Sequence, residues 1–453
     1  MSSGPQPRLP EHVAAFNGLL EDPTLALPSL ERFREAQVRN RLTFGDRTVS
    51  VALRPHLLSR ERFQAAVSAA RAIHSALTRL ERALLREQEL RAELDLGPEE
   101  ERLALADPGF RYSSPSSRLD SFFAEEVRYV EYNAESPAGM AYEDKMAEVF
   151  GRLPVMRTFR KRFRLRPLPV RRRQMDVMLR AFKQWGTGEA PVAAIVDWRG
   201  LPTAREFELF RDFFEQRGLR TLIGDPRQLE LRRGRLHLDG QPVNLIYRRV
   251  LTSELLAKGK EARALADAYL SGAACVVNSF RAKLLHKKMS LALLSDDRYA
   301  RLYDPHQRAA IERHVPWTRK LAEGPSTWRG QPVEDLLEHV ARNRSDLVLK
   351  PNDEYGGKGV VLGWTVDQQE WEKALKEALE RPHVVQEAVE VPREPFPVAM
   401  NGIQVMDLSV DLDPYLFDGR PGGVLTRLSS SALLNVTAGA GSIVPTYVVE
   451  GRA

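Results

Sequence analysis

The sequence has little cysteine and no long hydrophobic run. Cys275 is the only cysteine among 453 residues, so the chain cannot form an intramolecular disulfide. No apolar stretch approaches the roughly 20 residues that cross a bilayer, and the first residues lack the charged and apolar regions of a secretory signal. We therefore expect a protein of the reducing cytoplasm, without a membrane partner, in which Cys275 is a buried strand residue.

Several kinds of active site are also missing from the sequence. The nine histidines show no metal-ligand spacing, and no serine, cysteine or histidine stands in the pattern of an activated nucleophile. Neither a Walker P-loop nor a dinucleotide-binding glycine fingerprint is present. The chemistry is therefore expected not to depend on a covalent protein nucleophile or on a histidine-held metal.

The composition is that of a globular protein, with 43% hydrophobic and 28% charged residues. Its length predicts two or three domains. We expect an α/β (α+β) fold with a helical region over residues 1–110, an open α/β sheet over 111–285 and a third domain over 286–453. Apolar residues at helical spacing between residues 63 and 94 predict a packed helix or helical hairpin in the first region.

One block of charge departs from the even mixture of acids and bases elsewhere. Residues 157–173 contain nine basic residues and no acidic one. Such a block is suited to phosphates or an anionic substrate. We favour a solvated edge strand, whose charges oppose pairing with another sheet. Nucleic-acid binding is disfavoured, because only Phe159 and Phe163 offer stacking surfaces within the block.

The middle of the chain alternates strand and helix patterns. Strands at 192–196 and 219–223 flank a helix at 203–216, which predicts a βαβ unit, and a helix is expected over 281–295. Asp239-Gly240 predicts a hairpin between residues 235–238 and 243–247. Open α/β sheets bind ligands at the carboxyl ends of their strands, where Asp197, Asp225 and the pair at 248–249 stand, although a structural salt bridge is the commoner role for each.

The most informative stretch covers residues 346–364. An apolar strand ends at Lys350, a turn rich in glycine follows, and a second apolar strand begins at Val360. Glycines let backbone amides approach phosphate oxygens, because side chains would block that approach. A glycine turn between two strands predicts a flap over a phosphate-bearing ligand, and a plain hairpin with a glycine bulge is the alternative.

Further polar groups follow in the sequence. Residues 384–391 form a strand pattern that carries carboxylates, and Asp407, Asp411 and Asp413 alternate on one face of a later strand pattern. Arg427 and Asn435 come next. Carboxylate and amide oxygens are the ligands that Mg²⁺ prefers, with phosphates completing its coordination.

These motifs resemble the ATP-grasp fold. The resemblance rests on Lys-Pro before a Gly-Gly-Lys-Gly flap, Gln-Glu on the following strand, and an Arg-x-Ser-Ser segment before Asn-Val-x-Ala-Gly-x-Gly. More narrowly, segments near residues 132–139, 246–249 and 278–286 resemble the circularly permuted ATP-grasp proteins related to glutathionylspermidine synthase. The resemblance covers roughly residues 120–450, and its motifs are specific only when taken together.

The resemblance implies a role for each matching residue. Lys350 and Arg427 would be catalytic, Asn133, Glu135, Arg248 and Arg249 would bind substrate, and Mg²⁺ would be held by Asp411 and Asn435. No Glu-x-Asn pair occurs at Asn435, since Leu433 stands two residues before it, and Asp413 is the alternative second carboxylate. The implied ATP-binding residues are Lys283 or alternatively Lys288, with Lys350, Gly356, Gly357, Lys358, Gly359, Gln386, Glu387 and Glu390.

The implied activity is an ATP- and Mg²⁺-dependent ligase that joins a carboxylate to an amine. The γ-phosphoryl group would pass to a substrate carboxylate, and the amine of a small-molecule or peptide substrate would attack the acyl phosphate. The alternative is an ATP-binding protein without ligase activity, acting as a partner subunit or sensor. The presence of Lys350, Asp411, Arg427 and Asn435 together favours the enzyme.

Overall fold

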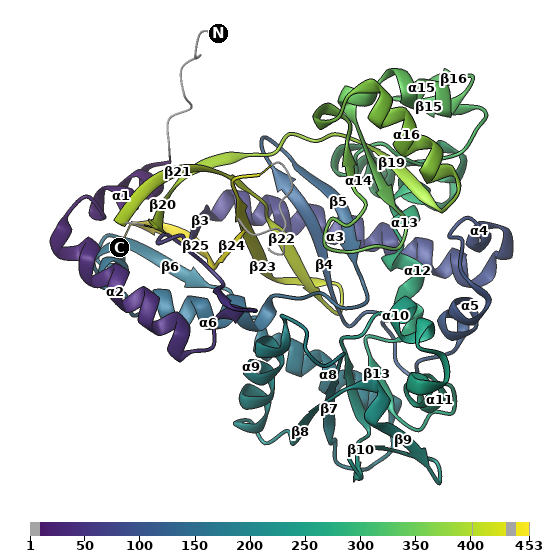
Figure 1. Cartoon of the computed structure of the whole chain (residues 1–453), viewed down its shortest axis with the longest axis horizontal. Coiled ribbons are helices and arrows are strands. Elements are labelled where there is room, and N and C mark those ends of the chain that lie inside the picture. Colours follow the sequence, from purple (N-terminus) through teal and green to yellow (C-terminus); the bar gives the residue numbers. More distant parts are fainter. Residues whose placement is uncertain (1–9, 401, 432–440, 453) are drawn as a thin grey trace.

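The central element is a seven-stranded sheet built from two distant parts of the sequence. The computed structural model describes residues 10–400, 402–431 and 441–452. The strand order is β20-β21-β23-β22-β4-β5, with β24 on β23, and all pairs are antiparallel. Strand β4 lies beside β22 (Figure 1). In this pairing Arg118 is opposite Tyr415. The strands are β4 (Ser116–Phe123), β5 (Val127–Asn133), β20 (Arg393–Met400), β21 (Gly402–Val410), β22 (Asp413–Phe417), β23 (Arg420–Ser429) and β24 (Ser442–Val444).

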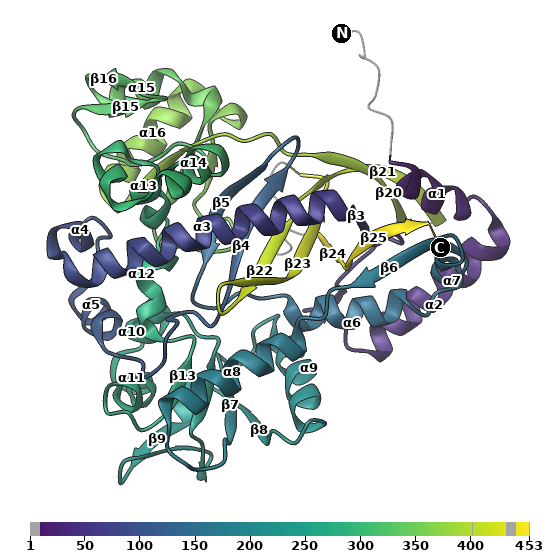
Figure 2. The ribbon, with the colours of Figure 1, turned by 180° about the vertical axis from the view of Figure 1, so that it is seen from behind.

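One long helix, α3 (Arg60–Arg86), runs across the back of this sheet (Figure 2). It begins where the Ser59 hydroxyl accepts a hydrogen bond from the Arg62 amide at 3.3 Å. Its apolar stripe is buried against side chains of the sheet such as Leu119, Tyr129 and Leu416. The helical pattern between residues 63 and 94 is thus confirmed, continued by α4 (Gln88–Ala92).

The remaining N-terminal elements pack around the ends of the central sheet. No helix in the described part of the chain is both long and apolar enough to cross a bilayer. These helices and strands are α1 (Glu11–Leu19), α2 (Pro23–Arg39), β1 (Thr43–Phe44), β2 (Arg47–Thr48), α5 (Pro98–Leu105), α6 (Met140–Phe150) and α7 (Pro154–Arg160).

The basic block contributes an edge strand. A three-stranded sheet has the order β3 (His56–Ser59), β25 (Thr446–Arg452) and β6 (Phe163–Pro167), so β6 lies at its edge. Arg162 pairs with Glu11 and Arg166 with Glu450, each at 2.9 Å. The edge-strand interpretation therefore holds for residues 163–167 only, because 157–160 belong to α7 and 171–173 begin the next helix, where Arg171 is buried against Asp144.

A four-stranded parallel sheet forms a second unit, with strand order β13-β12-β7-β8. The predicted βαβ unit and the buried position of Cys275 are confirmed. Its elements are α8 (Arg171–Trp185), β7 (Ala193–Val196), α9 (Ala204–Glu215), β8 (Thr221–Gly224), β9 (Leu229–Arg232), β10 (Arg235–Leu238), β11 (Gln241–Pro242), β12 (Leu245–Arg248), α10 (Thr252–Ala257), α11 (Arg263–Leu270) and β13 (Cys275–Val277).

Two predictions for this region need correction. The hairpin at Asp239-Gly240 pairs β10 with the short β11, because residues 245–248 leave to form the buried parallel strand β12. The predicted helix over 281–295 is broken into α12 (Lys283–His286) and α13 (Met289–Ser295). The side chain of Asn352 accepts a hydrogen bond from the Met289 amide at 3.0 Å, which stabilises the start of α13.

The third unit is a four-stranded antiparallel sheet with order β14-β19-β17-β18, covered by helices on one side (Figure 1). Its core contains Trp371, Leu349 and Val385. The predicted strand, glycine turn and strand around Lys350 are confirmed. The elements are α14 (Pro305–His314), β14 (Thr318–Lys320), β15 (Ser326–Trp328), β16 (Gln331–Val333), α15 (Leu336–Arg342), β17 (Leu347–Pro351), β18 (Val361–Leu362), α16 (Gln368–Leu379) and β19 (His383–Glu387).

Candidate functional site

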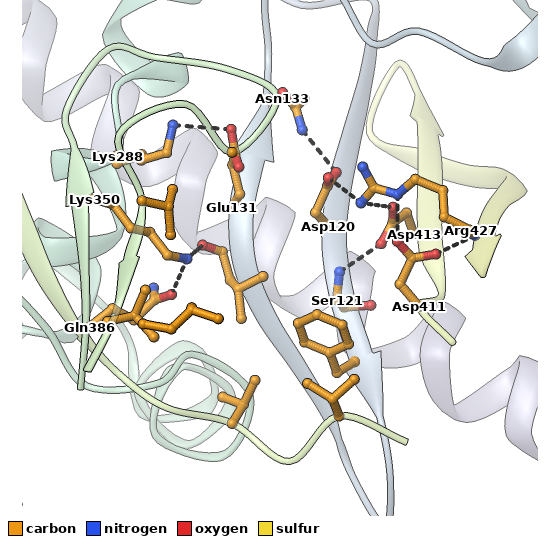
Figure 3. Close-up of a pocket in the computed structure, with 18 of the residues that line it drawn as sticks. Asp120, Ser121, Glu131, Asn133, Lys288, Lys350, Gln386, Asp411, Asp413 and Arg427 are labelled. Atoms are coloured by element: carbon orange, nitrogen blue, oxygen red, sulfur yellow. Dashed lines mark hydrogen bonds and ion pairs between the residues drawn. The ribbon is translucent and has the colours of Figure 1, made fainter. Parts of the chain in front are cut away.

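A cleft lies between the sheet that carries Lys350 and the central sheet (Figure 3). Its empty volume is about 1070 Å³, including the open mouth, which is ample for a small organic ligand. The polar and glycine residues that line it are Arg118, Asp120, Ser121, Glu131, Asn133, Lys288, Lys350, Glu354, Gly356, Gly357, Gln386, Glu387, Asp411, Asp413 and Arg427.

One wall of the cleft presents the Lys350 amine at the end of β17. Its Nζ atom donates to the Gln386 side-chain oxygen at 2.6 Å and to the Val130 carbonyl at 3.2 Å. Burial lowers the pKa of Lys350 to about 8, although the nearby Glu131 carboxylate acts in the opposite direction. Because Lys350 forms no ion pair with a carboxylate of the described residues, its positive charge is available to an anionic ligand.

A second lysine reaches the cleft from the break between α12 and α13. Lys288 Nζ lies 3.2 Å from a Glu131 oxygen and donates to the Glu354 carbonyl at 2.5 Å. Its own backbone amide donates to the Asn352 carbonyl at 2.9 Å. These contacts hold the glycine turn against the break between α12 and α13. Both segments carry residues that line the cleft.

The turn itself depends on glycine. Gly356, Gly357 and Gly359 have φ angles of +65°, +76° and +70°, in the left-handed region that other residues rarely adopt. A Cβ atom on Gly359 would also come within 2.7 Å of the Pro351 ring. Gly356 and Gly357 line the cleft, which places backbone amides beside the lysines.

The opposite wall is a cluster of charged groups on the central sheet. Arg427, on β23, lies within 2.9 Å of Asp120, 2.5 Å of Asp411 and 2.8 Å of Asp413. Arg118 binds the same Asp120 at 2.7 Å. Three carboxylates and two guanidinium groups therefore converge across the cleft from the lysines (Figure 3).

The carboxylates of this wall have different pKa values. Burial acts to raise the pKa of Asp120, but the charges of Arg118 and Arg427 outweigh it and hold that pKa well below the usual range. Burial raises the pKa of Asp411 against the opposing charge of Arg427. Burial, reinforced by the two neighbouring carboxylates, raises the pKa of Asp413 well above its ordinary value.

No family model matches the chain. In structure it is similar to a glutathione synthetase-like effector from Globodera pallida, with a TM-score of 0.61, 14% identity and coverage of 95% of this chain and 99% of that one. A looser likeness is to a RimK domain ATP-grasp protein from Sphaerobacter thermophilus, with a TM-score of 0.28, 17% identity and coverage of 56% of this chain and 89% of that one. The chain shares the overall fold of that effector. The predicted fold class is thus confirmed.

Two uncharacterized proteins are similar in sequence. One, from Mycobacterium leprae, is 27% identical over 332 residues, which make up 70% of this chain and 55% of that protein. The other, from Synechocystis sp., is 29% identical over 171 residues, which make up 35% of this chain and 33% of that protein. The chain thus spans about half of the first relative and about a third of the second.

Ten of the residues that the ATP-grasp resemblance implied line the cleft. They include Lys288, which was the alternative to Lys283, and Asp413, which was the alternative second carboxylate. Asn435 lies outside the described residues. The ten are Asn133, Lys288, Lys350, Gly356, Gly357, Gln386, Glu387, Asp411, Asp413 and Arg427.

Four other implied residues are buried elsewhere, in two ion networks. Arg248 and Lys283 both bind the Glu135 carboxylate, at 2.8 Å and 3.3 Å, and all three side chains are fully buried. Lys283 also holds Asp353 of the glycine turn at 2.5 Å. Arg249 pairs with Glu206 at 3.2 Å. Of the two alternative lysines, Lys283 and Lys288, only Lys288 lines the cleft.

The last three implied residues lie near the cleft but outside its lining. Lys358 is exposed on the glycine turn and lies 3.2 Å from Glu354. Gly359 packs against Pro351 behind the turn. Glu390 is exposed and does not line the cleft, although its neighbours Val389 and Val391 do.

The sequence interpretation missed four charged residues of the lining, namely Arg118, Asp120, Glu131 and Glu354. The sequence did contain a signal for one of them. Glu131-Tyr132-Asn133 is a Glu-x-Asn pair, but it lies about 300 residues before Asn435, where such a pair was expected. Alternation along β5 directs Glu131 and Asn133 to the same face. The described residues contain no group of three or more His, Cys, Asp or Glu side chains placed to hold a metal ion.

Proposed function

We propose that this chain is an ATP- and Mg²⁺-dependent ligase of ATP-grasp type that joins a carboxylate to an amine. The proposal rests on the two walls of the cleft, which face each other. Lys350, Lys288 and the glycine turn face the Arg427 cluster across one cleft. A triphosphate held by the first wall would present its terminal phosphoryl group to the second.

The first wall suits a nucleotide. Gln386 and Glu387 lie on β19 beside the apolar Val348, Leu362 and Val389, which offers polar and apolar contacts for an adenine ring. The Lys350 and Lys288 amines and the amides of the glycine turn would bind the phosphates. Lys350 is now held by two neutral oxygens, which a phosphate oxygen would replace with a stronger, charge-assisted partner.

The residue types near the phosphates would suit Mg²⁺, although the described residues contain no ready cluster of three such side chains. Glu131 and Glu354 place carboxylates in the cleft, and Asn133 places an amide beside them; these oxygens are hard ligands of the kind that Mg²⁺ prefers. Asp411, Asp413 and Asn435 remain proposed ligands, although Asp411 and Asp413 are now bound to Arg427. Bound Mg²⁺ would neutralise charge on the phosphate oxygens.

The proposed reaction has two steps. A carboxylate oxygen of the first substrate attacks the γ-phosphorus of ATP, the bond to ADP breaks, and an acyl phosphate forms. The amine of the second substrate then attacks the acyl carbon, inorganic phosphate leaves, and the nitrogen gives up a proton. Arg427 and Lys350 would hold the migrating phosphoryl oxygens, and the glycine turn would exclude water from the acyl phosphate.

The order of the walls in the sequence supports a narrower proposal. The Arg427 wall combines residues 118–133 with residues 411–427, and the lysine wall comes from the segment between them. This order supports membership of the circularly permuted ATP-grasp proteins related to glutathionylspermidine synthase. Small-molecule or peptide substrates at Asn133, and a cytoplasmic location, remain parts of the proposal.

Replacing Lys350 tests the nucleotide site. Lys350→Ala should weaken binding of the ATP analogue AMP-PNP about 10- to 100-fold, because a charge-assisted hydrogen bond contributes about 1.5–3 kcal/mol. Isothermal titration calorimetry with Mg²⁺ measures this loss. Lys373→Ala, at an exposed position on α16, is the matched control. Equal affinity in the two variants would count against the site.

Replacing Arg427 separates the ligase from a protein that only binds ATP, the alternative function. Arg427→Gln should leave AMP-PNP affinity within about threefold and reduce ADP release about 10²- to 10³-fold, because a group that contacts the transferred phosphoryl acts mainly in the transition state. The assay screens pairs of carboxylates and amines with the wild-type chain. Nucleotide binding without ADP release for any pair would favour the alternative.

A further inference from the structure

A second pocket lies on the opposite side of the central sheet from the cleft, beside α3. Its empty volume is about 1230 Å³, including its open mouth, so it is as roomy as the cleft. Its walls come from α3, from residues 111–113, from Arg281 and Gln307, and from the turn between β22 and β23 at residues 418–420. None of these residues belongs to the ATP-grasp resemblance as a site residue.

Five arginines surround this pocket, namely Arg79, Arg82, Arg111, Arg281 and Arg420. None of the five forms an ion pair with a carboxylate of the described residues, whereas Arg118, Arg248 and Arg427 all do. Two carboxylates line the pocket, and one of them, Asp418, is already bound by Arg180 at 2.7 Å. The pocket therefore carries an uncompensated positive charge.

Its inner wall also contains polar atoms without partners. His74 Nδ1, a Glu81 carboxyl oxygen and Arg281 Nε are buried and have no hydrogen-bond partner among the described residues. Burial lowers the pKa of His74 to about 4, so its ring is neutral at pH 7. Buried polar atoms are usually paired, and three unpaired ones around one hollow point to a ligand that supplies the missing contacts.

The pocket is held in shape by the fold. A Cβ atom on Gly419 would come within 2.3 Å of His74, so the turn between β22 and β23 packs directly on the ring. Gly419 has a φ angle of +73°, which the turn requires. Because its walls are a long helix and a hairpin turn fixed against each other, the site does not need to fold around its ligand.

We propose that this pocket binds a small anion that carries a phosphate group. Arginine presents planar pairs of N–H donors that match phosphate oxygens, and the excess of guanidinium groups over carboxylates in the pocket favours an anion with more than one negative charge. His74 and Glu81 would contact the remainder of the ligand or a hydroxyl of the phosphate. The site is separate from the cleft and does not depend on the proposed ligase activity.

The test is calorimetric titration of the full chain with inorganic phosphate at constant ionic strength. The double variant Arg82→Gln/Arg111→Gln should weaken phosphate binding at least tenfold, and both side chains are exposed, so the variant should fold. Arg32→Gln removes an equally unpaired, exposed arginine from α2 and should leave the affinity unchanged. Lys350→Ala, in the cleft, shows whether the ion binds there instead.

The outcomes separate the two sites. Loss of phosphate binding in Lys350→Ala, with normal binding in Arg82→Gln/Arg111→Gln, would place the ion in the cleft and overturn the proposal. Absence of phosphate binding by the wild-type chain would overturn it as well. A second titration with glucose 6-phosphate identifies the source of the phosphate group, because tighter binding of the ester assigns the pocket to an organic phosphate and weaker binding to the free ion.

Discussion

Two clusters of buried charged residues in this molecule contain the same residue types, but only one of them lines the cleft. In the first, Glu135 is enclosed by Arg248 and Lys283 and does not line the cleft. In the second, Arg427 is surrounded by carboxylates that do line it. A charged motif in a sequence therefore does not by itself distinguish a binding residue from a residue that joins two parts of a fold.

The energetics of the two clusters should differ as well. Glu135 is one carboxylate between two buried cations, and its pKa is held low by Lys283 and Arg248 although burial acts to raise it. Asp413 is one of three carboxylates on one guanidinium group, and its pKa is raised. Removing the charge of Glu135 leaves the buried Arg248 without a carboxylate partner, while Lys283 keeps Asp353 and Glu100. Removing the charge of Asp413 relieves a repulsion.

The largest expected effect comes from breaking the enclosed cluster. Glu135→Gln should lower the free energy of unfolding by about 3–5 kcal/mol, because it leaves the fully buried Arg248 without its carboxylate partner. Asp413→Asn should lower it by about 1 kcal/mol, the range of one exchanged hydrogen bond. Urea denaturation of both variants at pH 7 gives the two values. Similar losses in the two would remove the distinction between the clusters.

A smaller effect concerns the charge of Lys350 in the cleft. Burial lowers its pKa from the ordinary value of 10.5 to about 8, so the folded chain loses this proton at a lower pH than the unfolded chain does. Between pH 8 and pH 10.5 the free energy of unfolding therefore rises with pH, because Lys350 binds its proton in the unfolded chain and not in the folded one. Affinity for AMP-PNP should instead fall, since the cation is lost.

Calorimetry across pH 7 to 9.5 should show the AMP-PNP dissociation constant of the wild-type chain rising by up to about tenfold per pH unit above 8. Lys350→Arg keeps its charge throughout this range and should give a flat curve, which corrects for titration of the nucleotide itself. Parallel curves for the two proteins would show that Lys350 does not titrate near pH 8.

The smallest effect tests the backbone of the glycine turn. Gly359→Ala adds a Cβ atom 2.7 Å from the Pro351 ring at a φ angle of +70°, and should lower the free energy of unfolding by about 2 kcal/mol. Gly240→Ala has the same kind of φ angle, +75°, with no atom within 4 Å of the new Cβ, and should lower it by about 1 kcal/mol. Thermal unfolding measures the difference, which reports the steric contact alone.

The sequence by itself determined the local features of the fold and of the first wall. The apolar stripe of α3, the βαβ unit and the strand, glycine turn and strand around Lys350 all depend on residues close together in the chain, so periodicity and turn chemistry suffice to predict them. Lys350 and the cleft glycines belong to this group, whereas Gln386 was predicted from the resemblance to the ATP-grasp fold.

Only the tertiary structure decided which charged residues meet. Asp120 and Glu131 reach Arg427 and Lys350 because β4 pairs with β22 across nearly 300 residues, and no local pattern specifies such a pairing. A break in the helix after His286 likewise brings Lys288 into the cleft and leaves Lys283 buried on Glu135. The physical reason is that strand pairing and burial, which are long-range properties, set the direction of each side chain.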